Sequence, residues 1–326
     1  MSGYGMHGAV LFGPQASQDA VTVPNNYIAL PIISESMTTN IETIQEGSMY
    51  GRFSQSPTHK GMVSVEGSIE MEVGDITAGY PLLAAIGSDT VAQVAATDLY
   101  THTFDLSSAD APDDRWASQP IALEVYRDSG DAITYLGCVA NTLEMTITNG
   151  ELLTMNTGYV GAGFTRAAKT TTPDYADGGI FKWDSTCATY GGAAIVDLTD
   201  LTVSITKNIE PMYTLVACNS PYKMVRTDTE QVEISGTMIF QSDTYMEAYE
   251  DFSEAAFTAY FTIGTCGSLL ISAPAMKFKS FTPNMSGKGL VEASFTADAL
   301  FDETAKTALT ITLTNTQVPA YNASQV

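Results

Sequence analysis

An internal repeat constrains the fold of this chain more than any other feature. When the sequence is shifted by 169 residues, residues 65–71 (VEGSIEM) fall on residues 234–240 (ISGTMIF), with their glycines aligned. A shift of 168 places the Asn-Ile-Glu at 40–42 on the same tripeptide at 208–210. The repeat predicts two tandem copies of one structural unit, and 326 residues leave room for about two domains.

The repeated segments have the side-chain alternation of β-strands. From Val63 to Val73, apolar side chains alternate with serine or glutamate, which is typical of a strand with one buried face. Shorter alternating stretches occur at 121–126, 142–148, 201–206 and 309–314. The predicted fold class is therefore mainly β, with two tandem copies of a β-sandwich or half-barrel.

Each copy also contains a pattern for one short flanking helix. Side chains at helical spacing are Ile76, Tyr80 and Leu83 in the first copy, and Tyr245, Tyr249 and Phe252 in the second. Asp75 and Asp243 precede these patterns and are candidate N-caps. Pro81 restricts the first helix, because proline is tolerated only in a first turn.

Turn residues and the repeat together predict the domain boundaries. We expect an N-terminal arm at 1–30, a first domain at 31–165, a linker at 166–196, a second domain at 197–316 and a C-terminal tail at 317–326. Within the linker, Trp183 is expected to pack against a domain rather than to contact a ligand. The first copy carries an insertion near residues 88–118 whose role the sequence leaves open.

The charge balance excludes several classes of partner. The chain has 37 acidic and 14 basic residues, which gives a net charge of −23. Such a field repels nucleic acid, and it disfavours binding to an anionic membrane surface. We therefore expect neither sequence-specific DNA binding nor membrane binding. An acidic surface would instead suit a conduit to which DNA must not adhere.

The cysteines and the N-terminal region indicate a protein that is made and assembled in a cytoplasm. Residues 1–30 have no basic start followed by an apolar run, so no secretory signal is predicted. The four cysteines are widely and irregularly spaced, which argues against a disulfide framework or a zinc site. They are Cys138, Cys187, Cys218 and Cys266.

No catalytic, metal or cofactor site emerges from the sequence. The three histidines, His7, His59 and His102, have no metal-ligand spacing. The G-x-G-x-x-G match at residues 3–8 cannot follow a strand, because only two residues precede it. An acidic cluster around Pro112 is expected to be a solvated loop. We therefore predict no enzyme activity, no metal and no cofactor.

Two long excursions, 43–62 and 211–231, are candidates for docking loops. Loops of this length in compact domains are usually functional. In an acidic chain, their basic and aromatic side chains suit contact with an acidic neighbour, although a solvated loop tip is the simpler alternative. The candidate docking residues are Tyr50, Arg52, Phe53, Lys60, Tyr213, Tyr222, Lys223 and Arg226.

The sequence resembles the tail tube proteins of long-tailed bacteriophages, in the subgroup with two tube domains per chain. The resemblance covers about residues 27–315, and its motifs are fold patterns rather than chemical signatures. In the first copy they are 27–37, 51–53, 63–73, 100–104 and 135–143. In the second copy they are 208–213 and the strand around Gly236.

The resemblance implies tube domains of curved sheets, each with a flanking helix, whose sheets join neighbouring subunits around a lumen. It implies trimeric rings with pseudo-sixfold symmetry that stack into a virion tail. The implied partners are further copies, the tape measure, tail terminator and distal tail proteins, and DNA in passage. The strand faces expected to line the lumen, or alternatively to face outside water, carry Glu66, Ser68, Glu70, Glu72, Glu233 and Ser235.

Other functions stay open on the sequence alone. A tail-tip or hub protein can also carry two tube domains. A β-rich surface adhesin and a hydrolase that uses paired carboxylates are more distant alternatives. The absence of a predicted signal argues against the adhesin, and no carboxylate pair stands out for the hydrolase.

Overall fold

The computed structural model describes most of the chain, and strands dominate it. Strands account for 59% and helices for 7%, with two α-helices in the described part. The mainly β fold class is therefore confirmed. The described residues are 7–15, 18, 23–24, 27–48, 54–95, 97–106, 119–171, 173–176, 178–215, 219–264, 267–285, 289–317 and 321.

One large antiparallel sheet runs through both halves of the chain. Its strand order is β4–β5–β10–β9–β15–β18–β21–β20. The short β3 (Ser34–Glu35) also pairs with β5. The bounds are β4 (Thr38–Gln45), β5 (Thr58–Glu72), β10 (Thr154–Gly161), β9 (Ala132–Thr148), β15 (Leu198–Thr206), β18 (Gln231–Ile239), β21 (Glu292–Leu300) and β20 (Gly267–Asn284).

Two outer sheets cover the apolar face of the large sheet. The first has the order β12–β2–β1–β8–β9–β11, and the second β14–β13–β19–β20–β22–β7–β6. The strands of the first are β12 (Asp174–Tyr175), β2 (Ile28–Leu30), β1 (Ala9–Pro14), β8 (Ile121–Tyr126) and β11 (Gly163–Ala167). Those of the second are β14 (Ala193–Ala194), β13 (Thr186–Tyr190), β19 (Glu254–Ile263), β22 (Thr310–Asn315), β7 (Tyr100–Asp105) and β6 (Thr90–Gln93).

The same pairing pattern occurs twice. β4, β5, β10, β9 and β8 of the first half pair with one another as β15, β18, β21, β20 and β19 do in the second. The long strands β9 and β20 each carry two bulges, at corresponding places. At one bulge Ile121 pairs with Cys138 and Ala255 pairs with Met276, so the offset between the halves is 138 residues there.

The fall in offset explains why the later strands align poorly in the sequence. The offset is 169 at Gly67 and Gly236 but 138 at β9 and β20, a difference of 31 residues. Residues 88–118, the insertion, number 31. The described part of the insertion forms the hairpin of β6 and β7, and β7 pairs with the last strand of the second half, β22.

The two halves are joined at two seams. At the inner seam β9 pairs with β15, and at the outer seam β7 pairs with β22. One continuous cluster of buried apolar side chains lies between the sheets of both halves. We call the strands before residue 168 unit 1 and those from β15 to β22 unit 2, so that each seam joins unit 1 to unit 2.

The helices lie where the sequence predicts them, with shifted ends. α1 (Gly79–Ile86) begins after Ile76, and Pro81 is in its first turn. α2 (Thr244–Glu250) ends before Phe252, whose positive φ of 51° terminates it. Neither Asp75 nor Asp243 makes a side-chain capping hydrogen bond: Ala78 occupies the N-cap of α1, and Asp243 holds that position in α2 without such a bond.

Segments expected to be an arm and a linker take part in the sheets. Residues 9–14 form β1, which pairs with both β2 and β8. Residues 186–190 of the expected linker form β13, which pairs with β19. Both segments contribute buried apolar side chains, among them Leu11, Phe12 and Ala188, and this burial accounts for their order.

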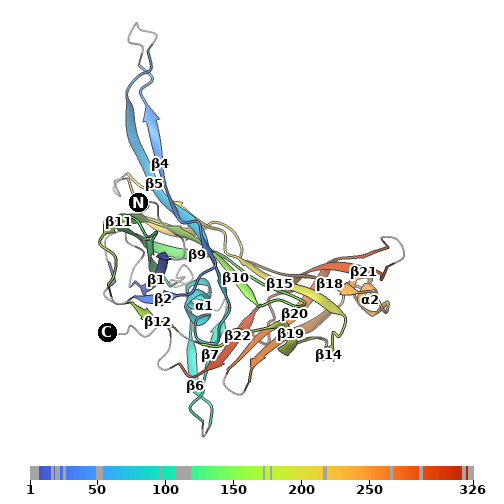
Figure 1. Cartoon of the computed structure of the whole chain (residues 1–326). Helices are drawn as coiled ribbons and strands as arrows, with labels where there is room; N and C mark the ends of the chain where they lie inside the picture. Colours follow the sequence, from blue (N-terminus) through green and yellow to red (C-terminus); the bar gives the residue numbers. More distant parts are fainter. Residues whose placement is uncertain are drawn as a thin grey trace.

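Two hairpins of unit 1 project from the body in opposite directions (Figure 1). The hairpin of β4 and β5 rises far above the sheets, and the hairpin of β6 and β7 extends below them. The hairpin of β20 and β21 marks the far end of the large sheet in unit 2. These projections leave backbone edges of the large sheet exposed at both ends of the molecule.

Candidate functional site

The candidate site is the polar face of the large sheet, opposite the core. In an antiparallel sheet, directly paired residues lie on the same face. The pairing therefore places Glu70, Asn156, Glu144, Ser204, Glu233, Asp298 and Lys277 in one row across seven strands. The row crosses the inner seam without interruption.

All six residues predicted to share a function lie on this face. Glu66, Ser68, Glu70 and Glu72 alternate along β5, and Glu233 and Ser235 alternate along β18. The opposite face of the same strands is buried, with Val65, Ile69 and Ile234 at most 1% exposed. The structure thus brings the six together on one surface.

Sequence reasoning missed further acidic residues on the same face. Glu144 of β9, Asp200 of β15 and Asp298 of β21 belong to it by register. Glu144 had a detectable signal, because it alternates with the buried Leu143 and Met145. Asp298 had the same kind of signal, because it alternates with the buried Ala297 and Ala299, whereas Asp200 lies next to a register shift of β15 that obscures its alternation.

Hydroxyl groups fill much of the remaining polar face. Glu72, Thr154, Thr146, Thr202, Ser235, Thr296 and Ser280 form a second row across both units. At the inner seam the hydroxyls of Thr146 and Thr202 lie 3.1 Å apart and share a hydrogen bond. Hydroxyl and carboxylate groups thus make most of this face hydrophilic.

The few ion pairs on this face leave it acidic. Lys279 Nζ lies 3.4 Å from Asp298 Oδ1 and 3.7 Å from Glu233 Oε2. Lys277 pairs with Glu254 at 3.5 Å. Within the described part of the chain, no basic side chain pairs with Glu66, Glu70 or Glu72. Exposed pairs of this kind contribute little to stability, so the carboxylates mainly set the field of the surface.

The first candidate docking loop is the outer part of the projecting hairpin. Lys60 is exposed on β5 and pairs with Thr43 of β4. His59 lies 2.7 Å from Glu46 near the tip. The hairpin also exposes Ile41, Ile44 and Met62, which are 44%, 59% and 45% accessible. Tyr50, Arg52 and Phe53 lie outside the described residues.

The second candidate loop folds back onto unit 1 instead of projecting. Its strands β16 (Ile209–Met212) and β17 (Lys223–Arg226) form a separate small sheet. Ile209 and Met224 are buried against Val139 and Ala162 of unit 1. The fold-back starts at Asn208, whose φ is 54° and whose side-chain amide donates to the carbonyl of Thr229 at 2.8 Å.

The residues expected to dock from this loop therefore divide into two groups. Tyr213 donates a hydrogen bond to the carbonyl of Val63 at 3.2 Å, and Arg226 pairs with Glu230 at 3.3 Å within the loop. Tyr222 is 64% exposed, and Lys223 is also exposed. Of these four residues, Tyr222 and Lys223 are the two with exposed side chains, and their docking role stays a prediction.

Two edges of the large sheet have no strand beside them in the described part of the chain. β4 pairs only with β5, so its other edge is open. β19 covers β20 as far as Lys277, and beyond it residues 278–284 pair only with β21. Open edges of this kind are templates for pairing with another chain.

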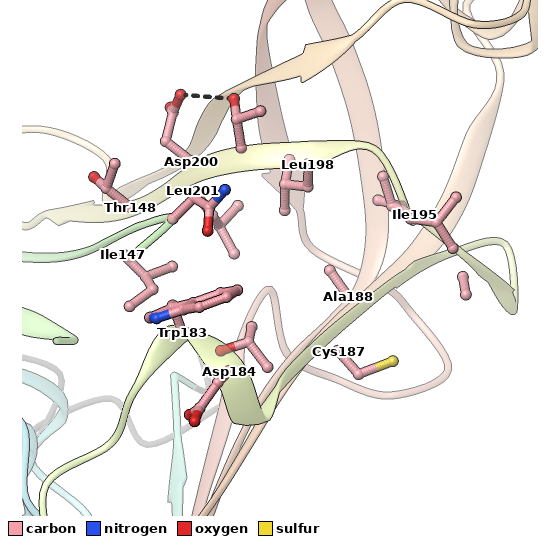
Figure 2. A pocket seen from close by; sticks show the side chains of 15 residues that line it. Ile147, Thr148, Trp183, Asp184, Cys187, Ala188, Ile195, Leu198, Asp200 and Leu201 are labelled. Atoms are coloured by element: carbon pink, nitrogen blue, oxygen red, sulfur yellow. Dashed lines mark hydrogen bonds between the residues drawn. The ribbon is translucent and has the colours of Figure 1, made fainter. Parts of the chain in front are cut away.

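A pocket of about 470 Å³ lies at the lower end of the inner seam (Figure 2). Trp183, in a short 3₁₀ turn, lies across it below Ile147 and Leu201, and is 48% exposed. Asp184 and Asp200 are at its rim, and Asp200 accepts a hydrogen bond from the Thr199 hydroxyl at 3.4 Å. The lining has no nucleophile paired with a base, so it indicates no chemistry.

The described residues contain neither a cluster of metal ligands nor a membrane-spanning helix. No group of three or more His, Cys, Asp or Glu side chains there could hold a metal ion. Neither described helix is long and apolar enough to cross a membrane.

Comparison with known proteins points to one family. A family model described as phage tail tube protein matches residues 7–299, which is nearly the whole chain. No curated protein matches the chain.

Proposed function

Because the chain belongs to the phage tail tube protein family, we propose that it is the repeating subunit of a hollow tail tube that conducts viral DNA. Membership makes it a structural component of the virion tail that assembles with itself and with other tail proteins. The finer proposal has three copies in each ring, six equivalent units around the lumen, and rings stacked into a tube after assembly in the host cytoplasm.

The observation that carries the ring proposal is the inner seam. Within one chain, β15 of unit 2 pairs with β9 of unit 1. The counterparts of these two strands are β4 and β20, and they are the strands with open edges. Pairing β4 of one copy with β20 of the next would repeat the inner seam, and three such contacts would close a ring.

The register of the inner seam supports a register for this contact. Ser36 of unit 1 and Asp200 of unit 2 are equivalent residues, because each approaches one of the two aligned glycines. A Cβ added at Gly67 would lie 2.7 Å from the Ser36 carbonyl oxygen, and one added at Gly236 would lie 2.4 Å from that of Asp200. In the inner seam Ile205 pairs with Leu143. The corresponding pair is Ile41 of one copy with Phe281 of the next, and this contact would cover the exposed Ile41.

Proline at position 283 limits the contact without preventing it. Pro283 pairs with Ala293 of β21 and lacks an N–H, so the open edge of β20 has one donor fewer. Its carbonyl can still accept a hydrogen bond from a neighbouring strand. The proposed seam is therefore weaker than the inner seam by one hydrogen bond, which suits a contact made after the chain has folded.

The polar face supports the lumen proposal. Because it is continuous across both units, repetition around a ring would line a bore with the rows of carboxylates and hydroxyls. DNA carries about one negative charge per 1.7 Å of its axis, so an acidic bore repels it and prevents adhesion. The projecting hairpin, with Lys60 and the exposed Tyr222 and Lys223 of the other loop, is the proposed contact between rings.

Negative-stain electron microscopy of the concentrated protein tests the proposal. We expect long hollow tubes whose end views show three strong and three weaker repeats. Single rings that do not stack would favour a tail-tip or hub protein instead. Particles the size of one chain at every concentration would contradict both.

A further inference from the structure

The C-terminal segment crosses from unit 2 to unit 1, where Tyr321 is buried. After β22, Gln317 lies beside β7, and Tyr321 is only 4% exposed. The Tyr321 ring lies between the helix and strand of unit 1, with centroids 4.9 Å from Tyr80 and 4.8 Å from His102. A tyrosine buried this deeply removes a large apolar area from water.

Hydrogen bonds hold this crossing to unit 1 and tie Asn315, Gln317 and Tyr321 to one another. The Tyr321 hydroxyl donates to the carbonyl of Ile76 at 2.7 Å and accepts from Asn315 Nδ2 at 2.8 Å. The Tyr321 amide donates to Asp89 Oδ2 at 2.8 Å. Asn315 Oδ1 accepts from the Gln317 amide at 2.8 Å. Burial raises the pKa of the Tyr321 phenol, so it stays a donor.

His102 connects the same segment to the insertion. Its side chain and that of Asp89 are both 0% exposed. His102 Nδ1 lies 3.1 Å from Asp89 Oδ2, and Nε2 lies 3.1 Å from the Gln317 carbonyl. Both ring nitrogens thus lie within hydrogen-bond distance of an oxygen, so His102 links Asp89 of the insertion to the C-terminal segment.

Gly79 makes room for the tyrosine. A Cβ at this position would lie 2.0 Å from the Tyr321 ring, a distance that no packing allows. Gly79 is the first residue of α1, where alanine would otherwise be the better helix former. The helix therefore carries a glycine that suits the C-terminal segment rather than the helix itself.

Unit 2 has no counterpart of this cover in the described part of the chain. Seven of the eight residues of α1 are buried, whereas α2 has none buried. The pocket for Tyr321 is built from α1, Asp89 and β7, and the segment that fills it follows the last strand of unit 2. The contact therefore acts between the units and not within either one.

We infer that Gln317 and Tyr321 act as a strap that clamps unit 2 to unit 1 at the outer seam and so fixes the angle between the units. The strap opens without unfolding of either core, since its contacts lie on one short segment outside the main sheets. With the strap open, only the β7–β22 ladder holds the outer seam, and the angle between the units is less firmly fixed. In the proposed ring, which this last step presumes, a fixed angle is what lets three copies close.

Two truncated chains distinguish the effect of the strap from that of the residues after Tyr321. Ending the chain after Thr316 removes the strap, and ending it after Tyr321 is the matched control that keeps it. In the free chain below its assembly concentration, we expect hydrogen exchange of α1 and β7 to be at least about tenfold faster without the strap. Exchange in β9, β10 and β18, and the circular dichroism, should match the control.

Gly79→Ala provides the second arm, through a double-mutant cycle. In the full chain this substitution should expel Tyr321 and accelerate exchange in α1 as the truncation does. In the chain ending after Thr316 it should have no adverse effect, because the ring it collides with is gone. If the short chain does not fold, Tyr321→Phe, which loses both hydroxyl hydrogen bonds, should still accelerate exchange in α1.

The outcomes distinguish the strap from the proposed function. The strap is overturned if removal of residues 317–326 leaves hydrogen exchange in α1 unchanged. It is also overturned if Gly79→Ala accelerates exchange equally in the full chain and in the chain that ends after Thr316. Where Tyr321→Phe replaces the truncation, unchanged exchange in that variant has the same meaning. Electron micrographs then test the angle: the strapless chain should give open arcs or rings of mixed size, and uniform rings overturn its role in closure. If the full chain forms no rings, the proposed function fails while the exchange result stands.

Discussion

Two glycines of the large sheet illustrate how single residues set the path of the backbone. An added Cβ would lie 2.5 Å from the Met37 Cα at Gly67, and 2.4 Å from the Asp200 carbonyl oxygen at Gly236. Gly67 also has a φ of 153°, which other residues rarely adopt. The sequence identified both as aligned glycines in mid-strand, and the structure supplies the reason, a neighbouring strand that passes too close for a side chain.

Alanine at either glycine should therefore destabilise the protein. We expect Gly67→Ala and Gly236→Ala each to lower the free energy of unfolding by about 2–4 kcal/mol, because the backbone in contact must shift. Gly130→Ala is the control, since Gly130 has a positive φ of 76° but nothing within 4 Å of an added Cβ. Urea unfolding measures all three, and equal losses would show that strand proximity is not the cause.

Lys207 is a buried cation beside the inner seam. It follows β15, is 3% exposed, and donates its amide to the Asn141 carbonyl at 2.9 Å. Burial, partly opposed by Glu230 and reinforced by Arg226, lowers the pKa of its ammonium group from 10.5 to about 8. This burial could not be predicted from the sequence, because it depends on the fold-back of the β16–β17 hairpin.

The lowered pKa predicts a pH dependence of stability. Between about pH 8 and 10.5 the unfolded chain holds a proton on Lys207 that the folded chain lacks, so stability rises with pH in this window. From pH 8 to 9.5 the wild type should gain on the order of 2 kcal/mol relative to Lys207→Met. Tyr27, whose pKa is raised to about 12, acts in the opposite direction only above pH 10. Parallel pH curves of both proteins in urea unfolding would contradict the assignment.

At the scale of elements, alternation predicted the strands well and the loops poorly. The apolar residues from Val63 to Val73 and from Leu201 to Ile205 are buried on one face, because both strands have one side in the core. The two excursions looked alike in sequence but differ in the structure. A left-handed residue at Asn208 turns one hairpin onto unit 1, whereas the hairpin of β4 and β5 continues straight. Such a difference depends on tertiary contacts that no local pattern records.

The open edge of β4 allows a test that leaves the hairpin intact. Ser36 donates its amide to Ser68 of β5, so by alternation the amides of Thr39 and Ile41 point to the open edge. Thr39→Pro should therefore fold normally, because the lost N–H pairs with nothing in the chain, yet it should form no rings.

Asn40→Pro is the matched control, since its amide points into the hairpin. It should lower the free energy of unfolding by about 3 kcal/mol. Melting temperature and electron microscopy distinguish the two. Normal tubes from the Thr39→Pro variant would rule out β4 as the edge that pairs between copies.

At the scale of the whole molecule, the net charge and the repeat predicted a hydrophilic surface shared by two equivalent halves. The strand register confirms that the acidic strands of both halves share one face. That the insertion adds a second seam could not be predicted from the sequence. β7 and β22 lie 205 residues apart between Thr310 and Asp105, and only tertiary structure brings them together. The same pairing makes the two units one body with two seams, which a tandem repeat alone does not require.

The acidic face allows one prediction about the molecule at work. Reversing Glu66, Glu70 and Glu72 to lysine places three cations on the proposed lumen surface of each unit 1, without touching the open edges or the core. Tubes should still assemble, while DNA attracted to the wall should leave virions at least about tenfold more slowly.

The control reverses Glu247, Glu250 and Asp251, which are exposed on or beside α2, away from this face. Triggered release from virions, followed by a DNA-binding dye at several salt concentrations, compares the two. Added salt should restore the rate in the first variant, since screening weakens the attraction. Normal release from both variants would place the acidic face outside the bore, whereas slow release from the control alone would place α2 there.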